Sequence, residues 1–199
     1  MKDQTTSNNK KKILLILALS VIPFLMALVS GGKAGFIKGK VNHGDLITPL
    51  ITTEATDFSG ADQFSQQNLK ELKGHWVILN VVSQSTCQQT CLDAVHKTKQ
   101  LRLMLNKDLT RVRRAVLFIA DVEPVVLKGW FKNDEALLKI KPAKGLLDKI
   151  RAIEHGNIPD GMLLLMDPLG NLMMQYPSGF DPYHVKSDLM HLLRVSQIG

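Results

Sequence analysis

The sequence contains two cysteines, Cys87 and Cys91, which are separated by three residues. Two cysteines so close together are not a disulfide framework, and a disulfide that closes so short a loop constrains the unfolded chain little. Neighbouring thiols can cycle between dithiol and disulfide, or they can hold a soft ion such as Cu(I). The alternative is a pair of ordinary buried thiols. Because no other cysteine is present, we favour a site of thiol chemistry.

The segment before the pair explains how it would be positioned. Residues 76–82, WVILNVV, are mostly apolar and rich in β-branched side chains, which predicts a strand buried on both faces. A polar loop over 83–86 and a helix over 90–106 follow. At such a helix start, free N–H groups and the helix dipole favour a thiolate. We therefore expect Cys87 to be the more acidic and accessible sulfur, with Cys91 one turn along the same helix face.

The rest of the chain predicts the elements around this site. We expect strands over 111–120, 162–166 and 171–176, and helices over 133–138, 145–155 and 182–195. Asp167 to Gly170 is a turn that makes the last two strands a hairpin, and Asp181 with Pro182 begins the last helix. Residues 41–67 should add short strands at the rim. Crossover helices make the first strands parallel, so the fold class is α/β: a thioredoxin-like fold with a central mixed sheet and flanking helices.

An apolar run stands near the N-terminus. Residues 13–30, ILLILALSVIPFLMALVS, are about as long as a helix that spans a ~30 Å hydrocarbon core. The run is longer than that of a signal peptide and no A-x-A site follows, so we favour an uncleaved anchor. We predict a cytoplasmic tail (1–12), a transmembrane anchor (13–30), a tether and rim segment (31–68) and the thioredoxin-like domain (69–199).

The lysines at residues 10–12 precede the anchor and predict a cytoplasmic N-terminus. The domain would then lie on the periplasmic side of a bacterial inner membrane, where a disulfide can persist. The net charge of +7 belongs mostly to residues 1–40, which hold seven lysines and one acid. The remaining chain is close to neutral, and this argues against nucleic acid as a partner.

With these motifs the sequence resembles the Sco/SenC family of membrane-anchored copper chaperones, over most of residues 70–199. Cys87 and Cys91 match the family's C-x3-C motif, and MLLLMDPLG (162–170) matches its strand and D-P-x-G hairpin. The segments NHGDLITP, DPLGNLMMQYP and LLRVSQIG are similar to a divergent group of small transmembrane proteins that tend to be encoded among bacterial cytochrome oxidase genes. The resemblance implies copper as the bound metal and a cytochrome c oxidase subunit, or another periplasmic thiol protein, as the partner.

The chain departs from the family at the third copper ligand. That ligand is a histidine about eight residues before the D-P turn, where this sequence has Pro159. Proline there is similar to ordinary thioredoxins, in which a cis-proline faces the cysteine pair. His155 is four residues upstream and is our candidate third ligand beside Cys87 and Cys91. The pair is therefore interpreted first as a dithiol and second as a copper site.

Other candidates are weaker. We expect surface or packing roles for the remaining histidines, and core positions for the methionines near the distal hairpin rather than a copper–thioether site. These residues are His43, His75, His96, His184, His191, Met162, Met166, Met173 and Met174.

Three functions remain open from the sequence. The first is an assembly factor for a respiratory cytochrome c oxidase, acting on copper delivery or on the thiol redox state of copper ligands. The second is a general thiol–disulfide oxidoreductase, in which Cys87 attacks a substrate disulfide and Cys91 resolves the mixed disulfide. The third is a non-catalytic membrane scaffold.

Overall fold

The computed structural model describes residues 3–31, 42–122, 130–131, 133–153 and 155–198. The chain forms two compact units, Met1–Val41 and Asn42–Gly199. The first unit contains helix α1 (Asp3–Gly31), with Pro23 inside it. Among the described residues, we find no helix with the length and apolar character needed to cross a membrane.

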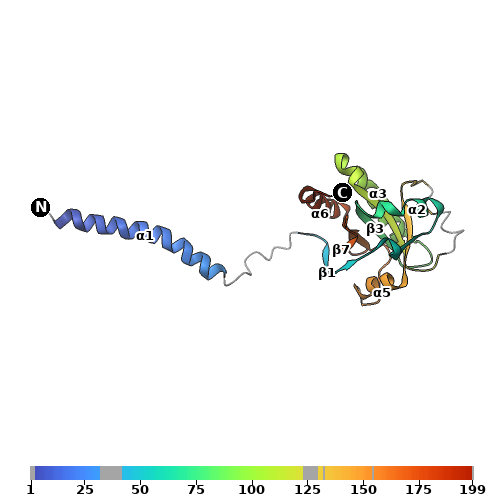
Figure 1. The fold of residues 1–199 in the computed structure, drawn as a ribbon, viewed down its shortest axis with the longest axis horizontal. Helices are drawn as coiled ribbons and strands as arrows, with labels where there is room; N and C mark the ends of the chain where they lie inside the picture. Colours follow the sequence, from blue (N-terminus) through green and yellow to red (C-terminus); the bar gives the residue numbers. More distant parts are fainter. Residues whose placement is uncertain (1–2, 32–41, 123–129, 132, 154, 199) are drawn as a thin grey trace. The chain divides into compact units, whose positions relative to one another are not determined.

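The second unit is built on one mixed sheet (Figure 1). Within the described residues the sheet has seven strands in the order β1-β7-β6-β3-β4-β5-β2. The strands are β1 (Asp45–Thr52), β2 (Phe58–Gly60), β3 (Trp76–Val82), β4 (Val112–Phe118), β5 (Leu138–Pro142), β6 (Leu163–Met166) and β7 (Asn171–Tyr176). The α-helices are α2 (Gln63–Gln67), α3 (Gln89–Leu103), α5 (Lys144–Ile153) and α6 (Pro182–Val195). Short 3-10 helices cover Ala55–Asp57, Leu69–Leu72 and Asn106–Arg111.

Strand β3 separates the two halves of the core. All of its side chains are buried. Val77, Leu79 and Val81 pack into a cluster with residues of α5, whereas Trp76 and Ile78 pack into a second cluster with residues of α3 and α6. Because side chains alternate along a strand, this division places α5 on one face of the sheet and α3 with α6 on the other.

The strand pairing confirms most of the predicted layout. Strand β3 pairs with β4 in parallel, and β4 pairs with β5 in parallel. Strands β6 and β7 form the predicted antiparallel hairpin, and the Gly170 N–H donates to the Asp167 carbonyl in its turn. Strands β1 and β2, from the predicted rim segment, pair at opposite edges of the sheet. The thioredoxin-like class of mixed sheet with flanking helices is confirmed.

One predicted element is wrong. Residues 133–138 do not form a helix: the described residues before Leu138 form turns, and Leu138 begins β5. In β5, Leu138 and Ile140 are buried, whereas Lys139 is half-buried. The sheet pairing to β4 and β2 determines this strand. Asn133, Asp134 and Glu135 suggested a helix cap that the tertiary structure does not use.

The first residues of the second unit are held by a buried carboxylate. Asp188 of α6 is only 5% exposed. Its Oδ2 accepts hydrogen bonds from the His43 N–H, the Gly44 N–H and the Tyr176 hydroxyl, each at 2.9 Å, and its Oδ1 lies 3.0 Å from His43 Nδ1. A Cβ at Gly44 would lie 2.7 Å from the side chains of Met174 and Tyr176, so a larger residue would displace them. The cluster joins the start of this unit to α6.

Burial acts to raise the pKa of Asp188, but the hydrogen bonds from Gly44, His43 and Tyr176 outweigh it and hold the pKa below its usual range. A carboxylate with a lowered pKa in the folded state contributes stability above its unfolded pKa. That contribution is lost as the pH falls through the folded pKa.

We therefore expect Asp188→Asn to lower the free energy of unfolding by about 2 kcal/mol at neutral pH, because an amide group replaces an acceptor of several hydrogen bonds. The difference between wild type and variant should shrink below about pH 4. Urea unfolding of the full chain in detergent micelles, from pH 3 to pH 7, measures this. Asp148→Asn, at an exposed site on α5, is the control. An equal loss at all pH values would contradict the prediction.

Candidate functional site

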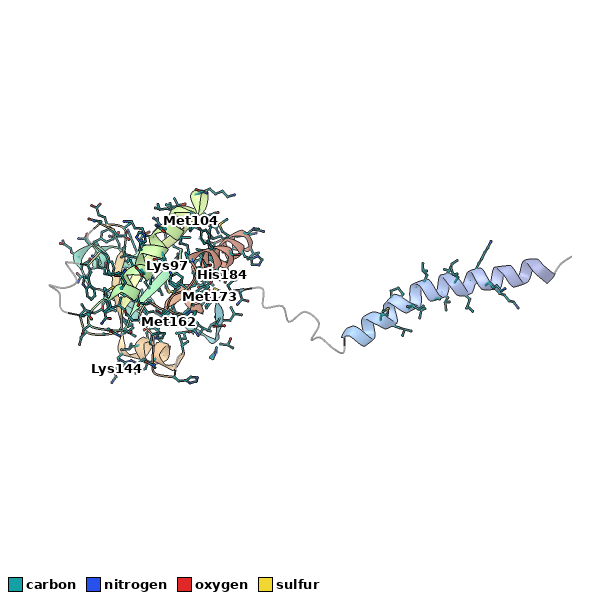
Figure 2. All side chains as sticks on the ribbon, turned by 180° about the vertical axis from the view of Figure 1, so that it is seen from behind. Lys97, Met104, Lys144, Met162, Met173 and His184 are labelled. Atoms are coloured by element: carbon teal, nitrogen blue, oxygen red, sulfur yellow. A yellow bond between two sulfur atoms is a disulfide. The ribbon has the colours of Figure 1, made fainter. Side chains whose placement is uncertain are left out.

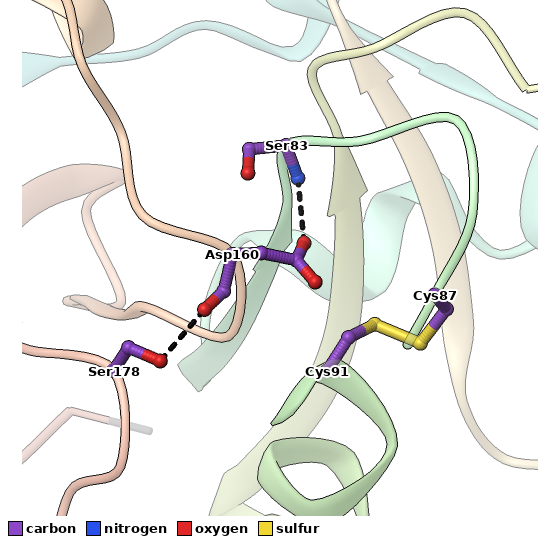
Figure 3. The surroundings of a disulfide bond; sticks show 5 residues. All are labelled: Ser83, Cys87, Cys91, Asp160 and Ser178. Carbon is purple, nitrogen blue, oxygen red and sulfur yellow. Dashed lines mark hydrogen bonds between the residues drawn. A yellow bond between two sulfur atoms is a disulfide. The ribbon is translucent and has the colours of Figure 1, made fainter. Parts of the chain in front are cut away.

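The two cysteines are joined as a disulfide at the end of strand β3. Cys87 lies in the loop between β3 and α3, Cys91 lies in the first turn of α3, and their Cα atoms are 5.2 Å apart (Figure 3). Cys91 is 1% exposed, whereas Cys87 is half-buried. Both sulfurs pack with Val82, Val95 and the side chains around them in one apolar cluster. A reagent therefore reaches Cys87 first.

The start of α3 leaves N–H groups for the cysteine pair. Gln88 is the N-cap residue, and its side chain makes no capping hydrogen bond with the described residues. The N–H groups of a first helical turn have no partner within the helix. Together with the helix dipole they stabilise a nearby thiolate. This arrangement supports the expectation that Cys87 is the attacking sulfur.

The loop before β6 forms the second wall of the site (Figure 3). The Ser83 N–H donates to Asp160 Oδ1 at 3.0 Å, and the Ser178 hydroxyl donates to the Asp160 carbonyl at 2.7 Å. A Cβ at Gly161 would lie 3.0 Å from the Thr90 carbonyl, so the loop runs directly against the first turn of α3. Figure 3 shows the Asp160 carboxylate between Ser83 and the Cys91 end of the disulfide.

Burial raises the pKa of the Asp160 carboxyl above its usual range, although the hydrogen bond from the Ser83 N–H acts in the opposite direction. Asp160 is not among the site residues that the sequence predicted. Its position directly after Pro159, opposite the predicted cysteine site, was the available signal.

Comparisons with known proteins agree with this architecture. Residues 76–196 match the family model described as "Transmembrane-like, thioredoxin-like, C-terminal domain". The chain belongs to this family. No curated protein matches the sequence. The matched region begins at β3 and ends one residue after α6, so it contains the cysteine pair, the loop with Asp160 and the distal hairpin.

Three solved structures show the same fold at low sequence identity. Apo Sco1 from Thermus thermophilus is 14% identical, with a TM-score of 0.54, and covers 76% of this chain and 96% of its own. Yeast Sco1 is 17% identical, with a TM-score of 0.51, over 64% of this chain and 84% of its own. Arabidopsis thaliana ScoI with copper bound is 15% identical, with a TM-score of 0.50, over 64% and 89%. At these identities the likeness is one of fold.

In this member of the transmembrane-like, thioredoxin-like family, His155 lies on a different segment from the loop and helix that carry the cysteines. It follows α5, is exposed, and has a left-handed φ of 51°. It lines a groove of about 730 Å³ between β1 and α5. Among the described residues no three His, Cys, Asp or Glu side chains are grouped as metal ligands, and this holds for Cys87, Cys91 and His155. The role of His155 as third ligand stays a prediction.

Pro159 differs from the thioredoxin pattern that the sequence suggested. Within the described residues the cis peptide bond is Thr48–Pro49, in strand β1, so Pro159 follows a trans bond. The expectation of a thioredoxin-like cis-proline at this position is wrong. The Pro159 carbonyl accepts from the Met162 N–H, and the Gly161 N–H donates to the Val81 carbonyl. These bonds fix the loop to the end of β3.

The methionines near the hairpin lie in the core, as predicted. Met162, Met166 and Met174 are buried, and Met173 packs against the cluster of α3 and α6 (Met162 and Met173 are labelled in Figure 2). Two histidines meet in a way that the sequence did not reveal: the rings of His43 and His184 stack with centroids 4.1 Å apart. His43 and His184 are far apart in the sequence, and the folded structure brings their rings together.

We expect the two sulfurs to differ in reactivity after reduction. Iodoacetamide should alkylate Cys87 at least about tenfold faster than Cys91, because Cys87 is half-buried and Cys91 is buried inside α3. Mass spectrometry of the full chain, quenched over time at pH 7, measures both rates. The single variants Cys87→Ser and Cys91→Ser serve as controls for each site. Equal rates, or faster labelling of Cys91, would contradict this assignment.

Proposed function

We propose that this protein is a membrane-anchored thiol–disulfide exchange factor that acts on the cysteines of a partner during assembly of a respiratory cytochrome c oxidase. The observation that carries the proposal is the unequal burial of one disulfide: Cys87 is half-buried before the helix start, and Cys91 is buried within it. An attacking sulfur must be reached by a partner, whereas a resolving sulfur is best kept from it.

The exchange balances in two steps. The Cys87 thiolate attacks one sulfur of a partner disulfide, and the other partner sulfur leaves as a thiolate and takes up a proton. Cys91 then gives up its proton and attacks the Cys87 sulfur, which releases the second partner sulfur as a thiol. Two electrons and two protons pass to the partner, and the pair becomes the disulfide of this structure. An external dithiol protein must then reduce the pair again.

The proposed anchor rests on the sequence of residues 13–30, although the described residues contain no helix with the length and apolar character of a membrane span. In helix α1, Ile13, Leu14 and Phe24 expose 64%, 73% and 66% of their surfaces. A helix that is apolar on all sides requires an apolar surrounding. A bilayer supplies one, and the lysines at 10–12 would keep the N-terminus in the cytoplasm. We propose that Asn42–Gly199 lies on the periplasmic side, where its disulfide persists.

The link to the oxidase rests on the likeness to Sco1 proteins in fold, on the C-x3-C spacing and on the motifs of the distal hairpin.

The link to the oxidase is testable in cells. In a strain that lacks this protein, we expect wild type to restore cytochrome c oxidase activity, and Cys87→Ser with Cys91→Ser to restore less than about a tenth of it. Blots with an alkylating gel-shift reagent should show partner cysteines left oxidised. Ser85→Ala, in the same loop, is the control. Full restoration by the double variant would support a non-catalytic scaffold instead.

Copper carriage is the second candidate, supported by the fold that this chain shares with copper-bound Arabidopsis thaliana ScoI. The residues present fit the three-ligand site only in part. Two thiolates suit Cu(I), but Pro159 offers no nitrogen donor, and His155 is not grouped with the cysteines among the described residues.

A titration separates the two candidates. The reduced full chain in detergent is titrated with Cu(I) against a competing chelator, and the midpoint potential of the pair is measured in parallel. We expect a potential within about −270 to −120 mV, the range of dithiol exchange proteins, and Cu(I) affinity that does not change in His155→Ala. A tenfold or greater loss of affinity in His155→Ala would establish the third ligand and favour copper carriage.

A further inference from the structure

A partly apolar pocket of about 450 Å³ lies beside the cysteine pair. Its apolar lining is Leu92 and Val95 of α3 and Phe131 of the turn that precedes β5, and its polar lining is His96, Lys99, Asn133 and Asp134. Phe131, Trp130 and Cys87 pack against the same buried cluster, which contains Cys91 and Val95. The pocket and the half-buried sulfur therefore border one continuous apolar surface.

Leu92 has a side chain that the folded domain leaves uncovered. It directly follows Cys91 in α3 and is 42% exposed. An isolated exposed leucine requires no explanation, but this one lines a pocket next to a reactive sulfur.

Phe131 is held in a conformation that a bulky residue rarely adopts. Its φ is 57°, in the left-handed region. The strain presents the ring at the end of an aromatic series: Phe118 of β4 contacts Trp130, and Trp130 contacts Phe131, with ring centroids 6.3 Å apart in both pairs. Strained backbone persists where the surroundings fix it, and it is frequent at binding sites.

Two polar contacts fix this turn against the sheet and α3. Arg114 of β4, only 4% exposed, donates from Nη1 to Asp134 Oδ2 at 2.6 Å, and Lys99 Nζ donates to the Asn133 carbonyl at 2.7 Å. The Asp134 N–H in turn donates to the Phe131 carbonyl at 3.0 Å. Asp134 and Lys99 thus have partners within the domain, and Leu92, Val95 and Phe131 supply the apolar part of the pocket.

We propose that this pocket receives an apolar side chain that flanks the reactive cysteine of the partner polypeptide. The inference rests on the proposed function, because a partner sulfur bonded to Cys87 lies about 2 Å from its Sγ. An extended chain advances about 3.3–3.6 Å per residue. The two or three residues beside the partner cysteine must therefore lie on the surface around Cys87, where Leu92, Val95 and Phe131 are the apolar side chains that line the pocket.

The test uses an exchange equilibrium without net oxidation. The full chain carrying Cys91→Ser, in detergent micelles, is loaded with glutathione at Cys87 and equilibrated with a pentapeptide thiol. The peptide thiolate displaces glutathione, so that one disulfide forms and one breaks. One peptide has leucine on both sides of its cysteine, and the other has serine at these positions. We expect the exchange constant to be about tenfold larger for the leucine peptide.

Matched variants assign the preference to the pocket. Leu92→Ser should reduce the tenfold preference to twofold or less. Leu103→Ser, at a leucine of the same helix that is 61% exposed and outside the pocket, should leave it unchanged. Equal constants for the two peptides would overturn the proposal, and so would an equal loss of preference in both variants. A dimer that dissociates in Leu92→Ser would also overturn it, because a second copy of the chain would then cover the pocket.

A separate measurement tests the proposed function. Reduction of 2-hydroxyethyl disulfide by the wild-type dithiol tests the exchange chemistry with a substrate too small to fill the pocket. The exchange equilibrium with Cys91→Ser requires no turnover, so its outcome decides the pocket whether or not wild type reduces the small disulfide.

Discussion

Strand β3 is the constraint on which the rest of the structure depends. None of its side chains faces solvent, because α5 covers one face of the sheet and α3 with α6 covers the other. The backbone at its end is bonded on both sides: the Val81 N–H and carbonyl pair with Met162 and Gly161, and the Val82 carbonyl accepts from the Ile119 N–H. The chain therefore leaves the sheet at Ser83, and the cysteines must occur where it turns into α3.

The same constraint makes the two sulfurs unequal. Cys91 points into the cluster formed by Val82, Val95 and Phe118, because the first turn of α3 packs on the ends of β3 and β4. Cys87 comes one residue before the N-cap, where the chain has not yet entered the helix. The burial of Cys91 and the partial exposure of Cys87 are therefore a consequence of where the strand ends. The difference in burial follows from the packing of α3 on the sheet.

Elements with strong local signals could be predicted from the sequence. Strands β3 and β7 and helix α6 have the predicted bounds, because an apolar β-branched run, a D-P-x-G turn and an Asp–Pro helix start each act within a few residues. Strand β5 could not be found in this way, because its two partner strands select it. The Asp188 cluster joins residues about 145 positions apart, and no local pattern reveals it.

The candidate site, like the fold, could be predicted from the sequence only where local patterns determine it. The C-x3-C spacing identified the pair, and the strand before it placed the pair at a helix start. The direction of His155 depends on a left-handed backbone angle and on the groove beside β1, neither of which the sequence determines. The same is true of the pocket wall at Phe131, whose position depends on the ion pair between Arg114 and Asp134.

The loop opposite the cysteines shows which chemistry the surroundings favour. Where the Sco/SenC resemblance calls for an imidazole, the chain has Pro159, and the next residue places a carboxyl group on the backbone N–H of Ser83. A carboxylate is a hard ligand and suits Cu(I) poorly. Burial raises the pKa of this carboxyl above its usual range, although the Ser83 N–H acts in the opposite direction. In the part of the chain that the structure describes, the loop opposite the disulfide therefore presents a half-buried carboxyl rather than a soft metal ligand (Figure 3).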